Sequence, residues 1–363
     1  MTEWKTYKLG DVVNILDNRR IPLSAREREQ RHGEYPYYGA QGIIDYVDDY
    51  LFDGTYLLIA EDGENLRSKK QNIAQLVSGK YWVNNHAHIL ESNGLCDIRY
   101  ICYLLNIIDI SGYITGSAQP KLNQANLLAI SISLPPLEEQ RRIAGILGAI
   151  DDKIECNRRI NANLESQAQA LHKQWFVDNR NDDWETKPLS EIITIYDSQR
   201  KPLSGQQREK MDKVYPYYGA ASLMDYVDGY LFDGIYLLLG EDGTVVDELG
   251  FPILQYVWGK FWVNNHAHIL TGKNGFSTET LYVLLKQTSV KSIVTGAVQP
   301  KISQANLKNI SVTIPPVHQL SKYNEVIEPL FKTIRKNNDE SSRLATLRDT
   351  LLPKLMNGKI KTE

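Results

Sequence analysis

Residues Tyr35 to Gly63 read YPYYGAQGIIDYVDDYLFDGTYLLIAEDG, and residues Tyr215 to Gly243 read YPYYGAASLMDYVDGYLFDGIYLLLGEDG. The two stretches are identical at 21 of 29 positions, without a gap, at an offset of 180 residues in a chain of 363. A period this long is typical of a duplicated domain, because the units that stack into solenoids are much shorter. The repeat therefore predicts two similar globular domains.

The repeat extends outward from these stretches in both directions. Trp82 to Leu90 (WVNNHAHIL) recurs unchanged at 262–270, and the Pro135-Pro136 pair recurs at 315–316. Trp4 matches Trp184 near the start of each copy. Each copy thus has a first part that ends at a Pro-Pro pair and a second part that follows it.

Composition narrows the class of protein. The net charge is -3, hydrophobic residues make up 42% and charged residues 23%, as in an ordinary globular protein. We expect no membrane span, because no apolar run approaches about 18–20 residues, and the first residues do not resemble a signal peptide. Cys96, Cys102 and Cys156 lack the spacing of a zinc site or a disulfide framework, so a reduced, cytoplasmic protein is expected.

The first part of each copy, residues 1–136 and 181–316, has the pattern of a compact α+β domain. Short alternating runs such as Tyr56 to Ile59 and Tyr81 to Val83 predict strands between turns. Residues 98–108 and 279–287 predict short amphipathic helices.

The second part of each copy, residues 137–180 and 317–363, predicts a long helix that begins after the Pro-Pro pair. Apolar and small polar residues recur at alternating spacings of four and three, which is a heptad seam. The expected seam is Ile143, Leu147, Ile150, Ile154, Asn157, Asn161 and Leu164 in one helix, and Ile327, Leu330, Ile334, Asn337 and Leu344 in the other. We expect the two helices to form an antiparallel coiled coil related by a pseudo-twofold axis, with the polar positions fixing register. The alternative is that each helix packs on its own domain.

His86 and His88, with their copies His266 and His268, form a His-x-His pattern that would place both rings on one face of a strand. The pattern permits a metal site, but a third ligand is missing unless Glu61 or Asp62 supplies one. The alternatives are a buried polar strand that braces neighbouring loops, and direct contact with a ligand or DNA. We predict no metal and no cofactor for this chain, and no catalytic residue, because phosphate loops, methyltransferase tetrapeptides and nucleophile elbows are absent from the sequence.

Local basic clusters stand out within these mildly acidic domains. Residues 19–31 and 200–213 each carry a net charge of +3, and a further cluster at 67–70 exists only in the first copy. Arginine and lysine neutralise phosphates, and tyrosine and glutamine can reach base edges. The candidate DNA-contacting residues are Arg19, Arg20, Arg26, Tyr37, Tyr38, Gln41, Arg67, Lys69, Lys70, Lys121, Arg200, Lys201, Arg208, Tyr217, Tyr218 and Lys301. Solvated charged faces and core tyrosines are the alternative.

These features together resemble the DNA specificity (S) subunit of a type I restriction–modification enzyme. The resemblance rests on GSAQPKL at 116–122, LPPLEEQRRIAGIL at 134–147, IECNRRINANL at 154–164, WFVD at 175–178 and LRDTLLPKLMNG at 347–358. It covers essentially the whole chain, although the second Pro-Pro pair is followed by Val317-His318-Gln319-Leu320 instead of the fuller motif.

The resemblance implies that each domain reads half of a bipartite target on double-stranded DNA and that the helices set the spacing. It implies two modification subunits that hold S-adenosylmethionine, restriction subunits that use ATP and Mg, and no catalysis by this chain. Since the copies are so alike, the target is expected to be nearly palindromic, with asymmetry arising at 41–44 against 221–224 and at 64–76 against 244–256. The alternatives are a duplicated metal hydrolase and a tandem protein that binds sugars or proteins.

Overall fold

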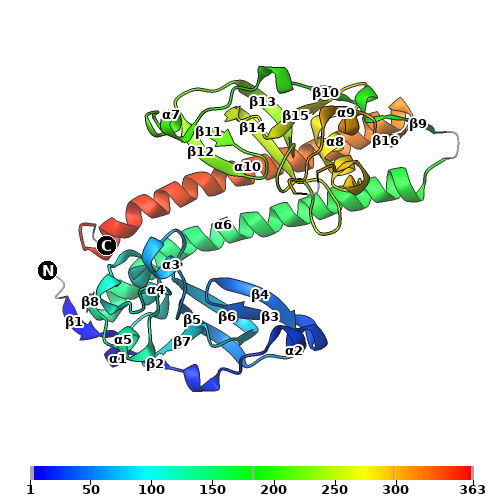
Figure 1. Ribbon diagram of the computed structural model, residues 1–363. Coiled ribbons are helices and arrows are strands. Elements are labelled where there is room, and N and C mark those ends of the chain that lie inside the picture. The colour runs from blue at the N-terminus through cyan, green and yellow to red at the C-terminus, as the bar shows by residue number, and fades with distance from the viewer. Residues whose placement is uncertain (1–3, 182–183, 297, 361–363) are drawn as a thin grey trace. The chain divides into compact units, whose positions relative to one another are not determined.

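The computed structural model describes residues 4–181, 184–296 and 298–360. The chain divides into two compact units, of which the first contains Met1–Glu155 with Ser342–Glu363 and the second contains Cys156–Ser341. Each unit holds one globular domain and a stretch of each of two long helices (Figure 1). The two-domain α+β architecture expected from the repeat is confirmed.

The globular domain of the first unit is built on a six-stranded sheet with the order β2-β7-β5-β6-β3-β4. Only β3 and β6 pair in parallel among these strands. The strands are β2 (Val13–Ile15), β3 (His32–Gly39), β4 (Gly42–Val47), β5 (Phe52–Ala60), β6 (Ala74–Val83) and β7 (Ala87–Ser92). A separate ribbon pairs β1 (Lys5–Lys8) with β8 (Ser131–Leu134).

Short helices and the apolar sides of the strands make the core of this domain. The strand β5 lies between β6 and β7, and its Leu57 and Ile59 are buried against Ile101 and Leu104 of α4. The helices are α1 (Leu9–Val12), α2 (Ala25–Gln30), α3 (Asn65–Ser68), α4 (Ile98–Ile107) and α5 (Gln124–Leu128), with 3-10 turns η1 (Asp17–Arg19) and η2 (Ser111–Tyr113). The expected strands near 56–59 and 81–83 and the helix near 98–108 are all present.

The second unit repeats this topology with the order β10-β15-β13-β14-β11-β12. Even the register is shared, since Leu57 pairs with Leu90 in the first sheet and Leu237 pairs with Leu270 in the second. The sheet strands are β10 (Ile193–Ile195), β11 (Tyr215–Tyr218), β12 (Leu223–Val227), β13 (Phe232–Gly240), β14 (Leu254–Val263) and β15 (Ala267–Gly272), and β9 (Glu185–Pro188) pairs with β16 (Ser311–Ile314). The helices are α7 (Gly205–Glu209), α8 (Thr278–Leu285) and α9 (Gln304–Lys308), with η4 (Leu189–Glu191), η5 (Asp197–Gln199) and η6 (Lys291–Ile293).

The two long helices are α6 (Leu137–His172) and α10 (Val317–Met356). Both begin directly after a Pro-Pro pair, because proline restricts the residue before it and lacks the N–H that a helix interior requires. A π-helical segment, η3 (Lys173–Asp178), continues α6. No helix in the described ranges combines the length and apolarity of a membrane span.

The two helices pair antiparallel within each unit. In the second unit the Tyr323 hydroxyl donates to the Ala168 carbonyl at 3.0 Å, while Asn161 contacts Asn338. In the first unit Arg348 pairs with Asp151 at 2.7 Å. Along these contacts the residue numbers fall in α6 as they rise in α10, which is the antiparallel arrangement. The expected antiparallel coiled coil is therefore confirmed.

The seam residues lie along these contacts. The buried members are Ile143, Leu147, Asn157, Asn161, Ile327 and Ile334, and the half-buried members are Ile150, Ile154, Leu164, Leu330, Asn337 and Leu344. Ile143 and Leu147 also join the core of the first globular domain. The proposed alternative, packing of a helix on a domain, thus occurs together with helix pairing.

Candidate functional site

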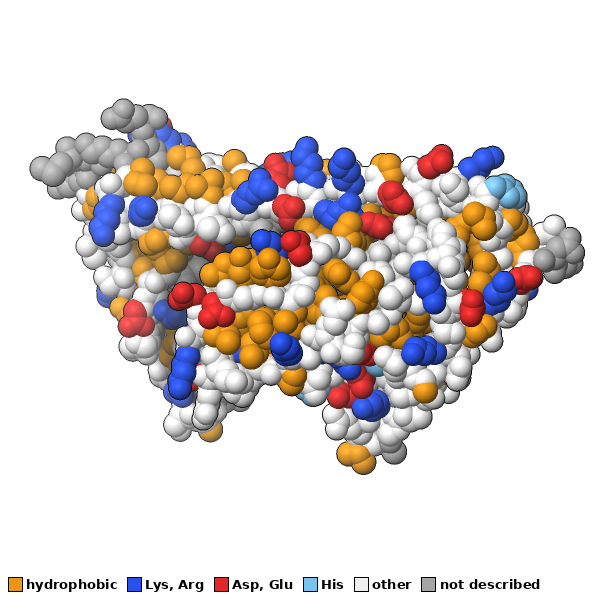
Figure 2. Space-filling view, turned by 90° about the horizontal axis from the view of Figure 1, so that it is seen from above, with side chains coloured by type: hydrophobic (Ala, Val, Ile, Leu, Met, Phe, Trp, Pro, Cys, Tyr) orange, Lys and Arg blue, Asp and Glu red, His pale blue; other side chains and the backbone are white. Residues whose placement is uncertain are grey.

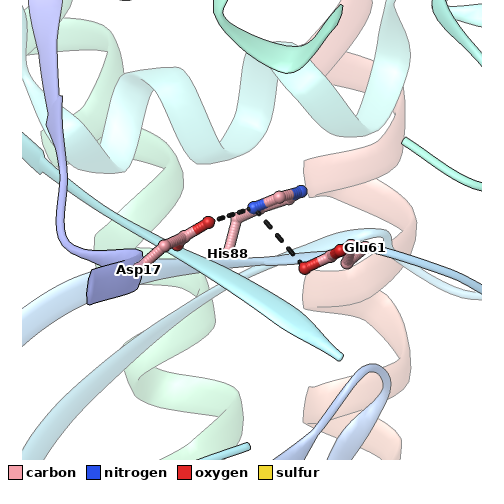
Figure 3. Close-up of side chains that lie close together, drawn as sticks. All are labelled: Asp17, Glu61 and His88. Atoms are coloured by element: carbon pink, nitrogen blue, oxygen red, sulfur yellow. Dashed lines mark hydrogen bonds and ion pairs between the residues drawn. The ribbon is translucent and has the colours of Figure 1, made fainter. Parts of the chain in front are cut away.

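A buried polar network occupies each globular domain. In the first domain it joins Asp17 of η1, Glu61 after β5 and His88 of β7 (Figure 3). The His88 Nδ1 lies 2.6 Å from Asp17 Oδ2 and 3.9 Å from Glu61 Oε2, and the ring is 1% exposed. These residues are separated by up to 71 positions in sequence, so the sheet brings them together.

Two cations complete the network and neutralise its carboxylates. Arg20 lies 2.8 Å from Glu61 and 3.2 Å from Asp17, and Lys121 lies 3.2 Å from Glu61. Burial raises the pKa of Glu61, but the hydrogen bond from Arg20, the charge of His88 and the hydrogen bond from Lys121 outweigh it and hold the pKa below its usual value. We conclude that Glu61 is a fully paired carboxylate.

The positions of the protons on His88 bear on metal binding. Its Nε2 lies 2.7 Å from the Leu122 carbonyl, which can only accept, so Nε2 carries a hydrogen. Its Nδ1 lies against Asp17, so both ring nitrogens are engaged by protein groups. A metal would have to displace the contacts of His88 with Asp17 and Leu122 and of Arg20 with Glu61, so this geometry gives no support to the metal-hydrolase alternative.

The second domain repeats the network almost atom for atom. His268 lies 2.6 Å from Asp197, and Arg200 lies 2.6 Å from Glu241. Burial raises the pKa of Asp197, but hydrogen bonds from His268 and from the backbone of Ile269, with the charges of His268 and Arg200, lower it by more, so the net shift is downward. Duplication to this precision indicates a shared architectural role.

That role is visible in the segment that the first network holds. Thr115 and Lys121 exchange two backbone hydrogen bonds of 2.8 Å, and Leu122 N donates to the Glu61 carbonyl. Between them the 116–119 loop, Gly116 to Gln119, is exposed. The buried network therefore anchors the base of an exposed polar loop, as the bracing alternative for the His-x-His strand proposed.

His86, the other histidine of the pattern, points outward. Its side chain is 50% exposed and its Nδ1 lies 2.7 Å from Asp62. Gly63 N donates to the Pro120 carbonyl at 3.1 Å, and the Gln41 side chain lies beside Gly63. The adjacent carboxylates Glu61 and Asp62 therefore both have partners near the loop. Glu61 pairs with Arg20 and Lys121, and Asp62 pairs with His86.

Several candidate DNA-contacting residues are corrected by the structure. Tyr37 and Tyr217 are 1% exposed, and Arg28 and Arg208 stack on their rings. Tyr38 and Tyr218 pack edge-on against Tyr81 and Phe261, and burial raises their pKa values.

The arginines Arg20, Arg200 and Arg208 are also committed to internal pairs, the last with Asp225 at 3.1 Å. A pattern of tyrosine and arginine in a turn-rich segment did not reveal that each cation had an internal carboxylate. These three arginines and the buried Tyr37 and Tyr217 are unsuited to contacting a duplex in this structure, whereas the half-buried Tyr38 and Tyr218 stay predictions.

The remaining candidates have exposed side chains. They are Arg19, Arg26, Gln41, Arg67, Lys69, Lys70, Lys121, Lys201 and Lys301. Arg67 donates to the carbonyls of Gly116 and Ser117, and Lys69 donates to the Ile108 carbonyl. On the face drawn in Figure 2, cationic side chains alternate with acidic ones instead of forming one basic patch.

Sequence reasoning missed Asp17 and Asp197 entirely. A signal was present, since Asp17, Arg20, Glu61 and His88 all recur at an offset of 180 residues. Polar residues that recur together in a duplicated core are candidates for a shared network.

Comparison with known proteins shows which family the chain belongs to. The model of the type I restriction modification DNA specificity domain matches residues 1–166 and 181–345. The chain belongs to this family. Its members are non-catalytic specificity subunits, so the expectation that this chain is not itself an enzyme is confirmed.

Individual relatives span the same length. A protein from Haemophilus influenzae named as a type I restriction enzyme specificity subunit is 25% identical, over 94% of this chain and 91% of its own. The MjaIX specificity subunit from Methanocaldococcus jannaschii is 24% identical, over 99% and 94%. The crystal structure of the S subunit from M. genitalium matches the fold with a TM-score of 0.60 at 17% identity, over 98% of this chain and 96% of that one.

Proposed function

We propose that this chain is the sequence-specific DNA-binding subunit of a type I restriction–modification complex. Each globular domain reads one half of a bipartite target and so directs methylation and restriction by partner subunits. The observation that carries the proposal is the match of the specificity model to both copies of the repeat. The shared strand order and register support two readers of one design.

The partners follow from the same proposal. Two modification subunits supply S-adenosylmethionine and methylate adenine, restriction subunits supply ATP-driven translocation and cleavage with Mg, and the complex acts in the cytoplasm. This subunit holds no cofactor of its own. What supports that division is the saturation of the clustered carboxylates by Arg20 and Lys121, and of the His88 nitrogens by protein groups.

The target is proposed to be nearly palindromic, with a gap set by helix length. Two domains of the same design are expected to read similar base sequences. When the two half-sites run in opposite directions, similar sequences make the target nearly palindromic. The helix α6 has 36 residues and rises about 54 Å at roughly 1.5 Å per residue. That length exceeds one turn of DNA, about 34 Å, so it suits half-sites about one turn apart.

The proposal is tested by reconstitution. The chain is expressed with a modification subunit of the same system in a host without adenine methylation, and the purified complex is assayed on genomic DNA. We expect co-purification, and methyl transfer to a single bipartite motif that disappears when this chain is omitted. A modification subunit that neither binds the chain nor needs it for that motif would contradict the proposal.

A further inference from the structure

The following inference rests on the proposed function and concerns where DNA is contacted. We propose that each domain touches the duplex through one polar surface, here called the loop surface. In the first domain the loop surface consists of His86, the 116–119 loop and Lys121. Its counterparts in the second domain include His266, Gln299 and Lys301.

The loop surface is rigidly mounted. Lys121 and Leu122, which follow the loop, are tied to Glu61 and His88 of the buried network. The backbone exchange between Thr115 and Lys121 closes the base of the loop. Exposed loops on rigid scaffolds are where proteins place recognition residues, because a fixed loop loses little conformational freedom on binding.

The exposed side chains of the loop surface are of the chemical types that contact DNA in other proteins. The amide of Gln119 can pair with the N6 and N7 of adenine, and Lys121 can neutralise a phosphate. In His86, Asp62 occupies Nδ1, which leaves Nε2 on the half-exposed ring for a phosphate or a base edge. The second domain presents His266 in the same way, with Nδ1 2.7 Å from Asp242.

Other exposed surfaces of the domain suit DNA less well. At α2, Arg28 pairs with Asp45 at 2.7 Å and Arg31 with Asp48 at 2.9 Å, and their side chains are only 19% and 33% exposed. Lys121 also has a carboxylate partner, Glu61 at 3.2 Å, but its side chain is 52% exposed and can reach a phosphate. The edge strand β4 exposes Ile43 and Ile44, which are apolar. The loop surface combines an exposed amide, an imidazole and a cation around a braced loop.

The two copies differ where half-sites would differ. Beside the shared His86, Gln119 and Lys121, the first domain has Gln41 and Arg67, which Ala221 and Asp247 replace. At the loop tip Ala118 is replaced by Val298, which is 100% exposed. Apolar side chains can contact the methyl group of thymine. We therefore expect a common contact from the two glutamines and distinct contacts around them.

The test uses the full complex with its modification subunits and the motif that the wild-type complex methylates. Gln119→Ala, Gln299→Ala and the control Gln30→Ala, a matched change on the exposed end of α2, are assayed against duplexes altered base by base. We expect Q119A to relax base preference in one half-site with at least about fivefold weaker binding. Q299A does the same in the other half-site, and Q30A changes neither.

The outcomes separate this inference from the proposed function. A wild-type complex without any bipartite motif would refute the proposed function itself. A wild-type motif that Q119A and Q299A leave unaltered in bases and affinity would overturn the inference alone, as would equal effects on both half-sites. Because both side chains are exposed, their variants are expected to keep the wild-type melting temperature. His86→Gln provides a second route: it should weaken binding severalfold, and unchanged binding would count against the loop surface.

Discussion

His172 shows how burial determines charge at a single residue. It lies at the end of α6, is 5% exposed, and packs edge-on against Phe176 and Tyr323. Burial lowers its pKa to about 4, although a hydrogen bond with Gln287 opposes the shift. In the unfolded chain the pKa returns to about 6.5, so between these values the unfolded state binds a proton that the folded state rejects.

The folded state is therefore fully stabilised above pH 6.5 and loses stability as the pH falls toward 4. The other long helix has a leucine, Leu352, at the position that corresponds to His172 in the repeat. We predict that the substitution His172→Leu removes this loss of stability at low pH. Urea unfolding at pH 7 and 4.5 should show that the wild type loses about 2 kcal/mol more than the variant. An identical decline in both proteins would contradict the assignment.

Residue roles were predictable from sequence only where neighbours in sequence are neighbours in space. The exposure of Arg67 to Lys70 agrees with a charged turn. Arg20 carries the same charge, yet its partner Glu61 is 41 positions away and holds its side chain mostly inside the domain, 15% exposed. Likewise Tyr37 is a core residue because its hydroxyl accepts from Leu23 N at 2.9 Å and Arg28 covers its ring.

At the scale of the elements, the polar seam positions differ in how well they are satisfied. Asn161 donates to Asn338 at 2.9 Å and accepts from Asn337 at 2.9 Å. Asn157 donates to Glu340 and Ser341, but its Oδ1 is buried without a hydrogen-bond partner. A buried unsatisfied oxygen costs free energy, whereas a satisfied amide fixes helix register.

This contrast gives opposite predictions for the same substitution. Asn157→Leu should raise the free energy of unfolding by about 1 kcal/mol, since it removes the unsatisfied buried oxygen, while Glu340 and Ser341, which lose its donated hydrogen bonds, are half-buried and within reach of water. Asn161→Leu should lower it by about 1–3 kcal/mol, since it removes the two satisfied hydrogen bonds of a buried amide and takes the acceptor away from the half-buried Asn337 amide. Chemical denaturation measures both, and equal effects of the two variants would show that hydrogen-bond satisfaction is not the deciding factor.

The segment 64–76 differs in local structure between the two domains. In the first domain it contains α3 and Arg67, and Asn106 Oδ1 accepts from the backbone of Ile73 and Ala74 at 3.0 Å. The second domain has Lys286 in place of Asn106. Grafting this segment onto 244–256 therefore requires Lys286→Asn to anchor it.

We predict that this graft makes the two half-sites of the methylated motif more alike, because it copies Arg67 into the second domain. The control is Lys286→Asn alone, which should leave the motif unchanged. Methylation-motif sequencing reads the result directly. An unchanged motif in the folded graft would remove this segment from base recognition.

Elements were more predictable than their packing. Heptad spacing and Pro-Pro pairs located both long helices, and the repeat implied equal sheets. It did not imply equal packing, since Phe331 fills a cluster with Tyr256 and Tyr282 in the second unit. The corresponding place in the first unit has Asp151 and a cavity of about 390 Å³, where Asp151 pairs with Arg348. Such differences arise because the two copies carry different side chains at equivalent positions although their backbones follow the same fold.

At the scale of the whole molecule, helix length is proposed to set the gap between half-sites. Inserting one heptad after Glu155 and one after Ser341 preserves the seam period in both helices. Each insert adds about 10.5 Å, or about 3 base pairs at roughly 3.4 Å. The methylated motif should gain about 3 unspecified base pairs, with less methylation because the half-sites also rotate by about 100°. An unaltered gap would show that the helices do not set the spacing.

The most direct measurement is sequencing of adenine methylation across the genome of the host, with this gene present and deleted. The account predicts one interrupted, nearly palindromic motif that is methylated only when the gene is present. Reintroducing the gene should restore the same motif. A methylation pattern that is identical with and without the gene, in cells that express the modification subunit, would contradict the account.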